Sequence, residues 1–127
     1  MKPPFILIIE DDDKNRKLAK DILEHQSYDV VAVASAEEGL AIVRNRRPDL
    51  ILLDIQLPGM SGLEAIHQLR SMPAVMDVAV IAFTASVMPA DQQRVLQAGF
   101  DALLPKPIAL KAFLATVQRL ILRREAE

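Results

Sequence analysis

The sequence predicts an α/β fold in which a five-stranded parallel sheet is doubly wound, with helices on both faces. Two observations lead to this prediction. Short, continuous apolar runs recur along the 127-residue chain, and each is followed by a segment with helical spacing of apolar residues. Continuous apolar runs are typical of strands buried on both faces, and helices usually join such strands in parallel sheets.

Five apolar runs are predicted to be the strands. Each run is rich in aliphatic residues and stops at a polar residue or a turn signal, as buried strands do. The predicted strands cover Phe5–Ile9, Val30–Val33, Leu50–Leu53, Val78–Phe83 and Ala102–Leu104.

The first helix is predicted to begin at Lys14, with Asp12 or Asp13 as its N-cap. Helical spacing places four apolar residues on one face, which we expect to pack on the sheet. These residues are Leu18, Ala19, Ile22 and Leu23.

The remaining helices follow the other four strands. The second helix is predicted over Ala36 to about Arg46, and Pro48 marks its end. The fourth is predicted over Met88–Ala98, with Gly99 at the C′ position. The third and fifth helices are recognised by their apolar stripes, which are Leu63, Ile66 and Leu69, and Leu110, Phe113, Leu114, Val117, Leu120 and Ile121.

The alternation of strands and helices predicts the topology. Right-handed crossovers between successive parallel strands give a doubly wound sheet, and the flavodoxin-like order 2-1-3-4-5 suits five such units. The site should then lie at the carboxyl ends of the strands, near the switch point between strands one and three. Since no linker or low-complexity segment divides the chain, residues 1–127 are expected to form a single domain without an output domain.

Composition and charge exclude several classes of function. Fifteen basic and 17 acidic residues give a net charge of -2, so no excess positive charge favours nucleic acid or an anionic membrane. The absence of cysteine excludes disulfides, thiolate metal sites and cysteine nucleophiles. The apolar runs are too short to span a bilayer, and no signal peptide is visible. A cytoplasmic protein that binds neither nucleic acid nor membrane is expected.

Polar residues stand where the predicted strands end. Glu10 and Asp11 follow the first strand, and Asp54 follows the third. Thr84 follows the fourth strand, and Lys106 lies just beyond the fifth. Because the carboxyl ends of parallel strands share one edge of the sheet, these side chains should converge in one crevice.

The three carboxylates, a lysine and a hydroxyl in one crevice suit one kind of chemistry. Neighbouring carboxylates repel each other, and a hard cation such as Mg²⁺ relieves that repulsion. A metal, an ammonium and a hydroxyl together can hold a phosphoryl group. Aspartate can form an acyl phosphate, and Asp54 is the best candidate acceptor because it stands alone after a buried strand.

Each of these residues also has an ordinary structural explanation. Acids before a helix commonly cap it, and an aspartate after a strand is commonly a turn residue. Thr84 could satisfy backbone groups, and Lys106 could lie in a solvated turn. The functional interpretation depends on the set, since four strand ends each supply a residue type that one mechanism needs.

The chain resembles a response regulator receiver domain. The resemblance runs from Ile6 to about Leu122, and it includes stand-alone cell-division and phosphorelay receivers. The motifs that carry it are Ile8-Ile9-Glu10-Asp11, the segment Leu52–Gly62, Thr84-Ala85, Ala98-Gly99 and Lys106-Pro107.

This resemblance implies a two-component phosphorelay function. It implies that Asp54 accepts a phosphoryl group from a phosphohistidine of a histidine kinase or phosphotransfer protein, and that the output is contact with a downstream protein effector. Such a domain assists its own phosphorylation and dephosphorylation and is otherwise not an enzyme. The resemblance assigns Mg²⁺ to Glu10, Asp11, Asp54 and the backbone carbonyl of Gln56, and the bound phosphoryl group to Thr84 and Lys106. It also implies a cis peptide bond between Lys106 and Pro107.

Two positions depart from the family pattern. Many receivers have tyrosine or phenylalanine three residues before the lysine, where this chain has Leu103. Leucine has no hydroxyl to donate, which puts the usual relay from the threonine in doubt. Pro105 removes a backbone donor beside the site and is expected to stiffen the loop.

Other interpretations remain at this stage. The chain could be a receiver excised from a hybrid histidine kinase, or a receiver-like interaction module that is never phosphorylated. A haloacid dehalogenase needs a second acid two residues after the aspartate, where this chain has Gln56. A flavodoxin needs a phosphate-binding Ser/Thr/Gly loop after the first strand, where acids stand instead.

Overall fold

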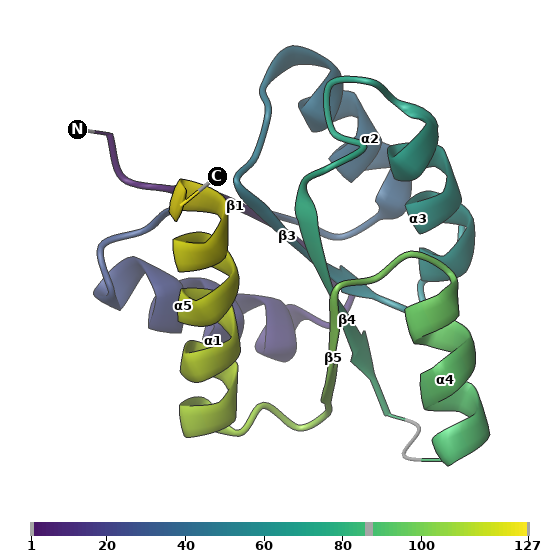
Figure 1. The fold of residues 1–127 in the computed structure, drawn as a ribbon. Helices are drawn as coiled ribbons and strands as arrows, with labels where there is room; N and C mark the ends of the chain where they lie inside the picture. The colour runs from purple at the N-terminus through teal and green to yellow at the C-terminus, as the bar shows by residue number, and fades with distance from the viewer. Residues whose placement is uncertain (1, 86–87, 127) are drawn as a thin grey trace.

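The computed structural model describes residues 2–85 and 88–126, and it contains all ten predicted elements (Figure 1). The strands are β1 (Phe5–Ile9), β2 (Asp29–Val33), β3 (Leu50–Asp54), β4 (Ala79–Thr84) and β5 (Ala102–Pro105). The helices are α1 (Asp13–His25), α2 (Ala36–Asn45), α3 (Gly62–Ser71), α4 (Pro89–Gln97) and α5 (Leu110–Ala126).

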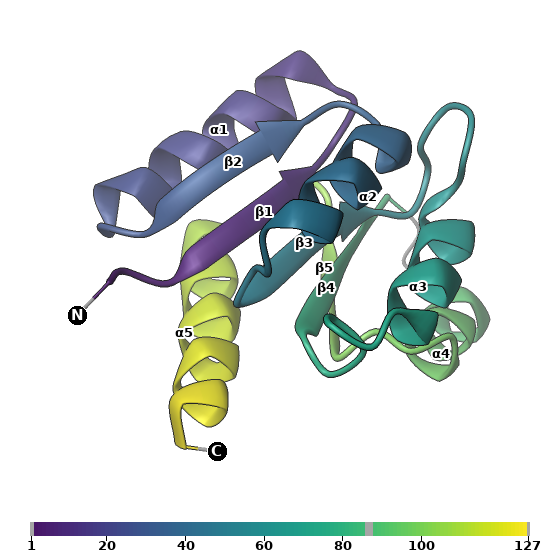
Figure 2. The ribbon, with the colours of Figure 1, turned by 90° about the horizontal axis from the view of Figure 1, so that it is seen from above.

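The sheet has the predicted topology. Its five strands lie in the order β2-β1-β3-β4-β5, and all neighbouring strands are parallel. Figures 1 and 2 show α1 and α5 on one face of the sheet and α2, α3 and α4 on the other. The predicted doubly wound, flavodoxin-like fold is therefore confirmed.

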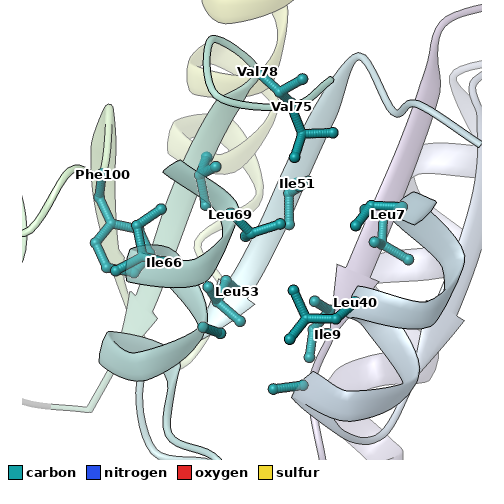
Figure 3. Close-up of a cluster of buried hydrophobic side chains, with 14 of the residues drawn as sticks. Leu7, Ile9, Leu40, Ile51, Leu53, Ile66, Leu69, Val75, Val78 and Phe100 are labelled. Carbon is teal, nitrogen blue, oxygen red and sulfur yellow. The ribbon is translucent and has the colours of Figure 1, made fainter. Parts of the chain in front are cut away.

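Alternate residues of each strand supply two separate hydrophobic cores. On β1, Ile6 and Ile8 face α1 and α5, whereas Leu7 and Ile9 face the opposite helices. The larger cluster is shown in Figure 3, where side chains of β1, β3 and the covering helices interdigitate. Because both faces are covered, every residue of β1 and β3 is buried, which explains the continuous apolar runs in the sequence.

Helices α1 and α4 begin within one residue of their predicted starts, and several strand boundaries also differ from the prediction by one residue. Asp12 is the N-cap of α1, and its side chain accepts a hydrogen bond from the backbone N–H of Asn15. Gly99 follows the C-cap of α4 with a positive φ of 121°, as predicted. β4 begins at Ala79 instead of Val78, because the N–H of Val78 closes a turn onto Val75.

Two leucines that were predicted to face the core are exposed. Leu18 is 46% exposed, because the buried face of α1 is centred on Ala19 and Leu23 and Leu18 lies to one side of it. Leu110 is 53% exposed, and the buried stripe of α5 starts one turn later at Phe113. Among the described residues, no helix has the length and apolarity needed to cross a bilayer.

Candidate functional site

The strand ends converge at one edge of the sheet. Glu10 directly follows β1, Asp54 ends β3, Thr84 ends β4, and Lys106 directly follows β5. Glu10, Asp54 and Thr84 are buried polar residues, with 3%, 1% and 5% of their surface exposed. Buried polar groups are costly unless they are paired, so their placement calls for partners within the crevice.

Three carboxylates meet in this crevice. Glu10, Asp11 and Asp54 each offer an oxygen, and these oxygens all lie within 4.8 Å of one another. Glu10 and Asp54 are buried and Asp11 is exposed, so the cluster opens to solvent on the side of Asp11. A set of carboxylate oxygens at this spacing fits a hard divalent cation.

Lys106 pairs with the two buried acids. Its Nζ atom donates a hydrogen bond to Oδ2 of Asp54 at 2.8 Å and lies 2.8 Å from Oε1 of Glu10. The lysine side chain is 20% exposed, so these ion pairs are shielded from bulk water. One cation between two anions leaves a net negative charge in the crevice, to which exposed Asp11 adds.

The pKa values of these groups reflect burial and their mutual contacts. Burial raises the pKa of the Glu10 carboxyl from 4.5 to about 7, and the hydrogen bond from Lys106 opposes this rise only in part. Burial lowers the pKa of Lys106, but the hydrogen bonds to Asp54 and Glu10 outweigh burial and raise it above its ordinary value. The ammonium of Lys106 therefore stays charged at neutral pH.

The backbone after β3 fixes the carboxylate of Asp54. The N–H of Gln56 donates to Oδ1 of Asp54 at 2.9 Å, and the N–H of Gly62 donates to the carbonyl of Ile55 at 3.0 Å. A Cβ atom at Gly62 would lie 2.4 Å from the carbonyl oxygen of Asp54, so only glycine permits this close approach. The backbone N–H of Gln56 therefore binds Asp54. Metal binding by the Gln56 carbonyl stays a prediction.

The fifth strand brings Lys106 to Thr84. The N–H of Lys106 donates to the carbonyl of Thr84 at 2.8 Å, and Thr84 is in register with Pro105. The peptide bond between Lys106 and Pro107 is cis, as expected. Leu103 is partly buried and packs against the core under α2, α3 and α4, so it fills space there without offering a polar group.

One residue beside the acids was not singled out by the sequence pattern. Nη1 of Arg16 donates to the backbone carbonyls of Glu10 at 3.0 Å and Asp11 at 3.3 Å, and Nη2 donates to Oδ1 of Asp13 at 2.5 Å. The position of Arg16 in the sequence could have indicated its role, because a cation is unfavourable in the first turns of a helix. An arginine there needs nearby acceptors to compensate.

The sequence matches the model of the response regulator receiver domain over residues 6–118. The chain belongs to this family. A receiver domain is a component of two-component signalling and not an enzyme in its own right, and it implies a kinase as partner.

Curated relatives and solved structures agree with this assignment. The receiver is 39% identical over 116 residues to the polar-differentiation response regulator DivK of Brucella anthropi, covering 91% of this chain and 94% of the relative. A CheY-like receiver from Methanospirillum hungatei superposes with a TM-score of 0.89 at 31% identity and 98% coverage of both chains.

A second similar structure holds a metal. The receiver domain of a sensor histidine kinase from Pseudomonas aeruginosa has a TM-score of 0.87 at 30% identity, covering 94% of this chain and 98% of that one. It is described with a magnesium ion coordinated in its active-site cleft. The acidic cluster of the present receiver is consistent with phosphorylation-dependent signalling and with metal binding.

Proposed function

We propose that this receiver is a phosphorylation-dependent switch in which Asp54 accepts a phosphoryl group from a phosphohistidine of a histidine kinase or phosphotransfer protein. The observation that carries the proposal is the pairing of Asp54 with Lys106, at 2.8 Å, inside an acidic cluster at the carboxyl edge of the sheet. A carboxylate held next to a buried cation is placed to react with an anionic donor, because the cation offsets the repulsion between them.

The transfer is a substitution at phosphorus. A carboxylate oxygen of Asp54 forms a bond to phosphorus while the phosphorus–nitrogen bond of the phosphohistidine breaks, and the imidazole leaves with the electron pair. The N–H of Gln56 orients the carboxylate through Oδ1. We assign Lys106 and Thr84 to contacts with the phosphoryl oxygens, since Lys106 already lies at Asp54 and both residues end in the same crevice.

The cofactor in this proposal is Mg²⁺. Glu10, Asp11 and Asp54 would hold it, together with the backbone carbonyl of Gln56, and the three carboxylate oxygens fit such an ion by number and spacing. When bound, Mg²⁺ neutralises charge on the donor phosphate and on the surrounding carboxylates. Lys106 remains the resident cation that holds Glu10 and Asp54 in place.

The proposed output is a change in protein–protein contacts. Phosphorylation adds negative charge and strong acceptor oxygens beside Thr84, which ends the strand that leads into α4. A displacement of Thr84 would therefore alter the surface formed by α4 and its neighbours. We take residues 1–127 as one receiver domain that acts in the cytoplasm on a downstream protein, without binding nucleic acid or a membrane.

Intact mass spectrometry tests the acceptor assignment. Wild type is incubated with Mg²⁺ and a small-molecule phosphodonor beside two variants, Asp54→Asn and Asp77→Asn. Asp77 is the matched control, because it is an exposed aspartate whose described ion pair is with Arg47. One phosphoryl group on wild type and Asp77→Asn, and none on Asp54→Asn, is expected. No addition to wild type from this donor or from phosphohistidine donors would favour a non-phosphorylated interaction module.

A further inference from the structure

One residue binds three successive carbonyl groups of the acidic segment. The guanidinium of Arg16 donates to the carbonyls of Glu10 and Asp11, at 3.0 and 3.3 Å. The backbone N–H of the same residue donates to the carbonyl of Asp12 at 2.9 Å. Glu10 and Asp11, the two acids that this segment gives to the proposed cation site, therefore both have their backbone carbonyls bound by Arg16.

Arg16 is poorly placed to stabilise the helix in which it lies, so its hydrogen bonds to the acidic segment are the better explanation of its position. Arg16 is the fourth residue of α1, near the positive end of the helix dipole, where a cation is unfavourable. Its side chain is nevertheless 24% exposed and folds back over the start of the helix. A lysine or arginine selected for solubility alone would extend into water instead.

The bonds also set the direction of the backbone. Carbonyl oxygens that point to the guanidinium do not point into the crevice, where the side-chain oxygens of Glu10 and Asp11 gather with Asp54. A second bond restrains the same turn, because the N–H of Asp12 donates to Oε2 of Glu10 at 3.1 Å. The guanidinium thus places positive charge behind the acids without occupying their carboxylates.

We propose that Arg16 is a positioning residue for the cation site, which holds the Glu10–Asp12 backbone so that the carboxylates are preorganised before a metal binds. This inference rests on the proposed function, since it concerns the same site. Preorganisation lowers the cost of ordering the ligands on binding, and groups that orient metal ligands typically affect metal affinity 10- to 100-fold. Arg16 does not touch the metal or the phosphoryl group in this account.

Isothermal titration calorimetry of the metal-free protein with MgCl₂ tests the proposal directly. Arg16→Met keeps the stem but removes all guanidinium bonds, and it is expected to weaken Mg²⁺ binding by about tenfold. Arg16→Lys keeps the charge but loses the planar fork, so it should recover only part of that affinity. Amide hydrogen exchange of the metal-free protein should be faster over residues 10–16 in Arg16→Met than in wild type.

Arg94→Met is the matched control. Arg94 forms the same i,i+3 ion pair with an aspartate, Asp91 on α4, at 2.9 Å, whereas Arg16 pairs with Asp13 at 2.5 Å. The Arg94→Met substitution should leave Mg²⁺ affinity unchanged. With a small-molecule phosphodonor, Arg16→Met should need more Mg²⁺ for half-maximal phosphorylation but reach the wild-type rate at saturation.

The outcomes separate this inference from the proposed function. Wild-type Mg²⁺ affinity in a folded Arg16→Met or Arg16→Lys variant overturns the positioning role and leaves the acceptor assignment intact. An equal loss in Arg94→Met overturns it too, because the effect would then be one of general charge. Failure of the wild type itself to bind Mg²⁺ overturns both. If Arg16→Met does not fold, the comparison of Arg16→Lys with wild type decides.

Discussion

The Nζ atom of Lys106 lies 2.8 Å from Oδ2 of Asp54, although 52 positions separate these residues in the chain. Asp54 ends β3 and Lys106 follows β5, and the two strands are not neighbours because β4 lies between them. The contact therefore exists only when the sheet is complete. It links folding of the last strand to the ion pair of the proposed acceptor.

Loss of Lys106 is expected to destabilise the metal-free protein in a pH-dependent way. Lys106→Met leaves the buried carboxylates of Glu10 and Asp54 without their cation, and breaking a buried pair costs about 3 kcal/mol. The loss should be larger at pH 8 than at pH 5, because Glu10, with a pKa of about 7, is protonated at the lower pH. Urea unfolding in EDTA at both pH values measures it.

Lys17→Met provides the control for that experiment. The ammonium of Lys17 pairs with Asp21 on the exposed side of α1, and such surface pairs contribute little to stability. An equal loss of stability in Lys106→Met at the two pH values would contradict the account of the site.

The raised pKa of Glu10 predicts how the stability of the metal-free wild type depends on pH. Its folded pKa of about 7 lies above the ordinary 4.5, so the folded state binds this proton more tightly than the unfolded state. The resulting stabilisation is complete below about pH 4.5 and is lost as the pH rises through about 7. Urea midpoints in EDTA should therefore fall across this window in wild type.

Glu10→Gln should flatten that dependence, because the amide does not titrate. Glu24→Gln, at an exposed position on α1, should retain the wild-type slope. A steep fall in the Glu10→Gln variant would show that other groups produce the effect. Mg²⁺ should offset the loss above pH 7, because the ionised carboxylate is the form that binds a cation.

Gly62 is expected to tolerate no side chain. In Gly62→Ala, the new Cβ would lie 2.4 Å from the carbonyl oxygen of Asp54 and 2.7 Å from Cα of Ile55, so backbone must move. We expect a loss of about 2 kcal/mol in the free energy of unfolding and slower phosphorylation of Asp54. Thermal unfolding and the rate of phosphoryl uptake measure the two effects.

Gly39→Ala is the comparison for Gly62→Ala. Its Cβ would meet Cδ1 of Ile9 at 2.3 Å, which is the end of a side chain and can rotate away. Stability should fall, but the phosphorylation rate should stay near that of wild type. Equal phosphorylation rates for the two alanine variants would contradict a role of Gly62 in positioning Asp54.

Arg70 is expected to stabilise the fold without affecting the site. Its guanidinium donates to the carbonyls of Gly99, Met76 and Val78 and pairs with Asp101, at the edge of the sheet opposite to the acidic cluster. Arg70→Met should lower the free energy of unfolding by about 3 kcal/mol, because several acceptors lose a charged donor. Phosphoryl uptake below the unfolding temperature should be unchanged, and a marked loss of uptake would argue against this separation.

The sequence predicted the strand ends well because each is marked by a chemical change. Ile9 to Glu10 and Leu53 to Asp54 are abrupt steps from aliphatic to acidic residues, and topology then brings the steps together. A local pattern was sufficient for these residues because parallel strands share one carboxyl edge.

Other features depend on tertiary contacts that a local pattern does not contain. Leu18 has the spacing of a core residue, yet the sheet covers only the side of α1 that carries Ala19 and Leu23. The bonds from Arg16 to the backbone of Glu10 and Asp11 depend on how the chain turns between β1 and α1. The approach of Gly62 to Asp54 likewise follows from the path of the loop after β3.

The most direct test of the central claim is chemical mapping of the phosphorylated residue. Phosphorylated protein is treated with borohydride, which reduces an acyl phosphate of aspartate to homoserine, and the digested peptides are sequenced by mass spectrometry. Homoserine is expected at position 54 in wild type and should be absent in Asp54→Asn. Homoserine at position 11 or at another aspartate, with residue 54 unmodified, would contradict it.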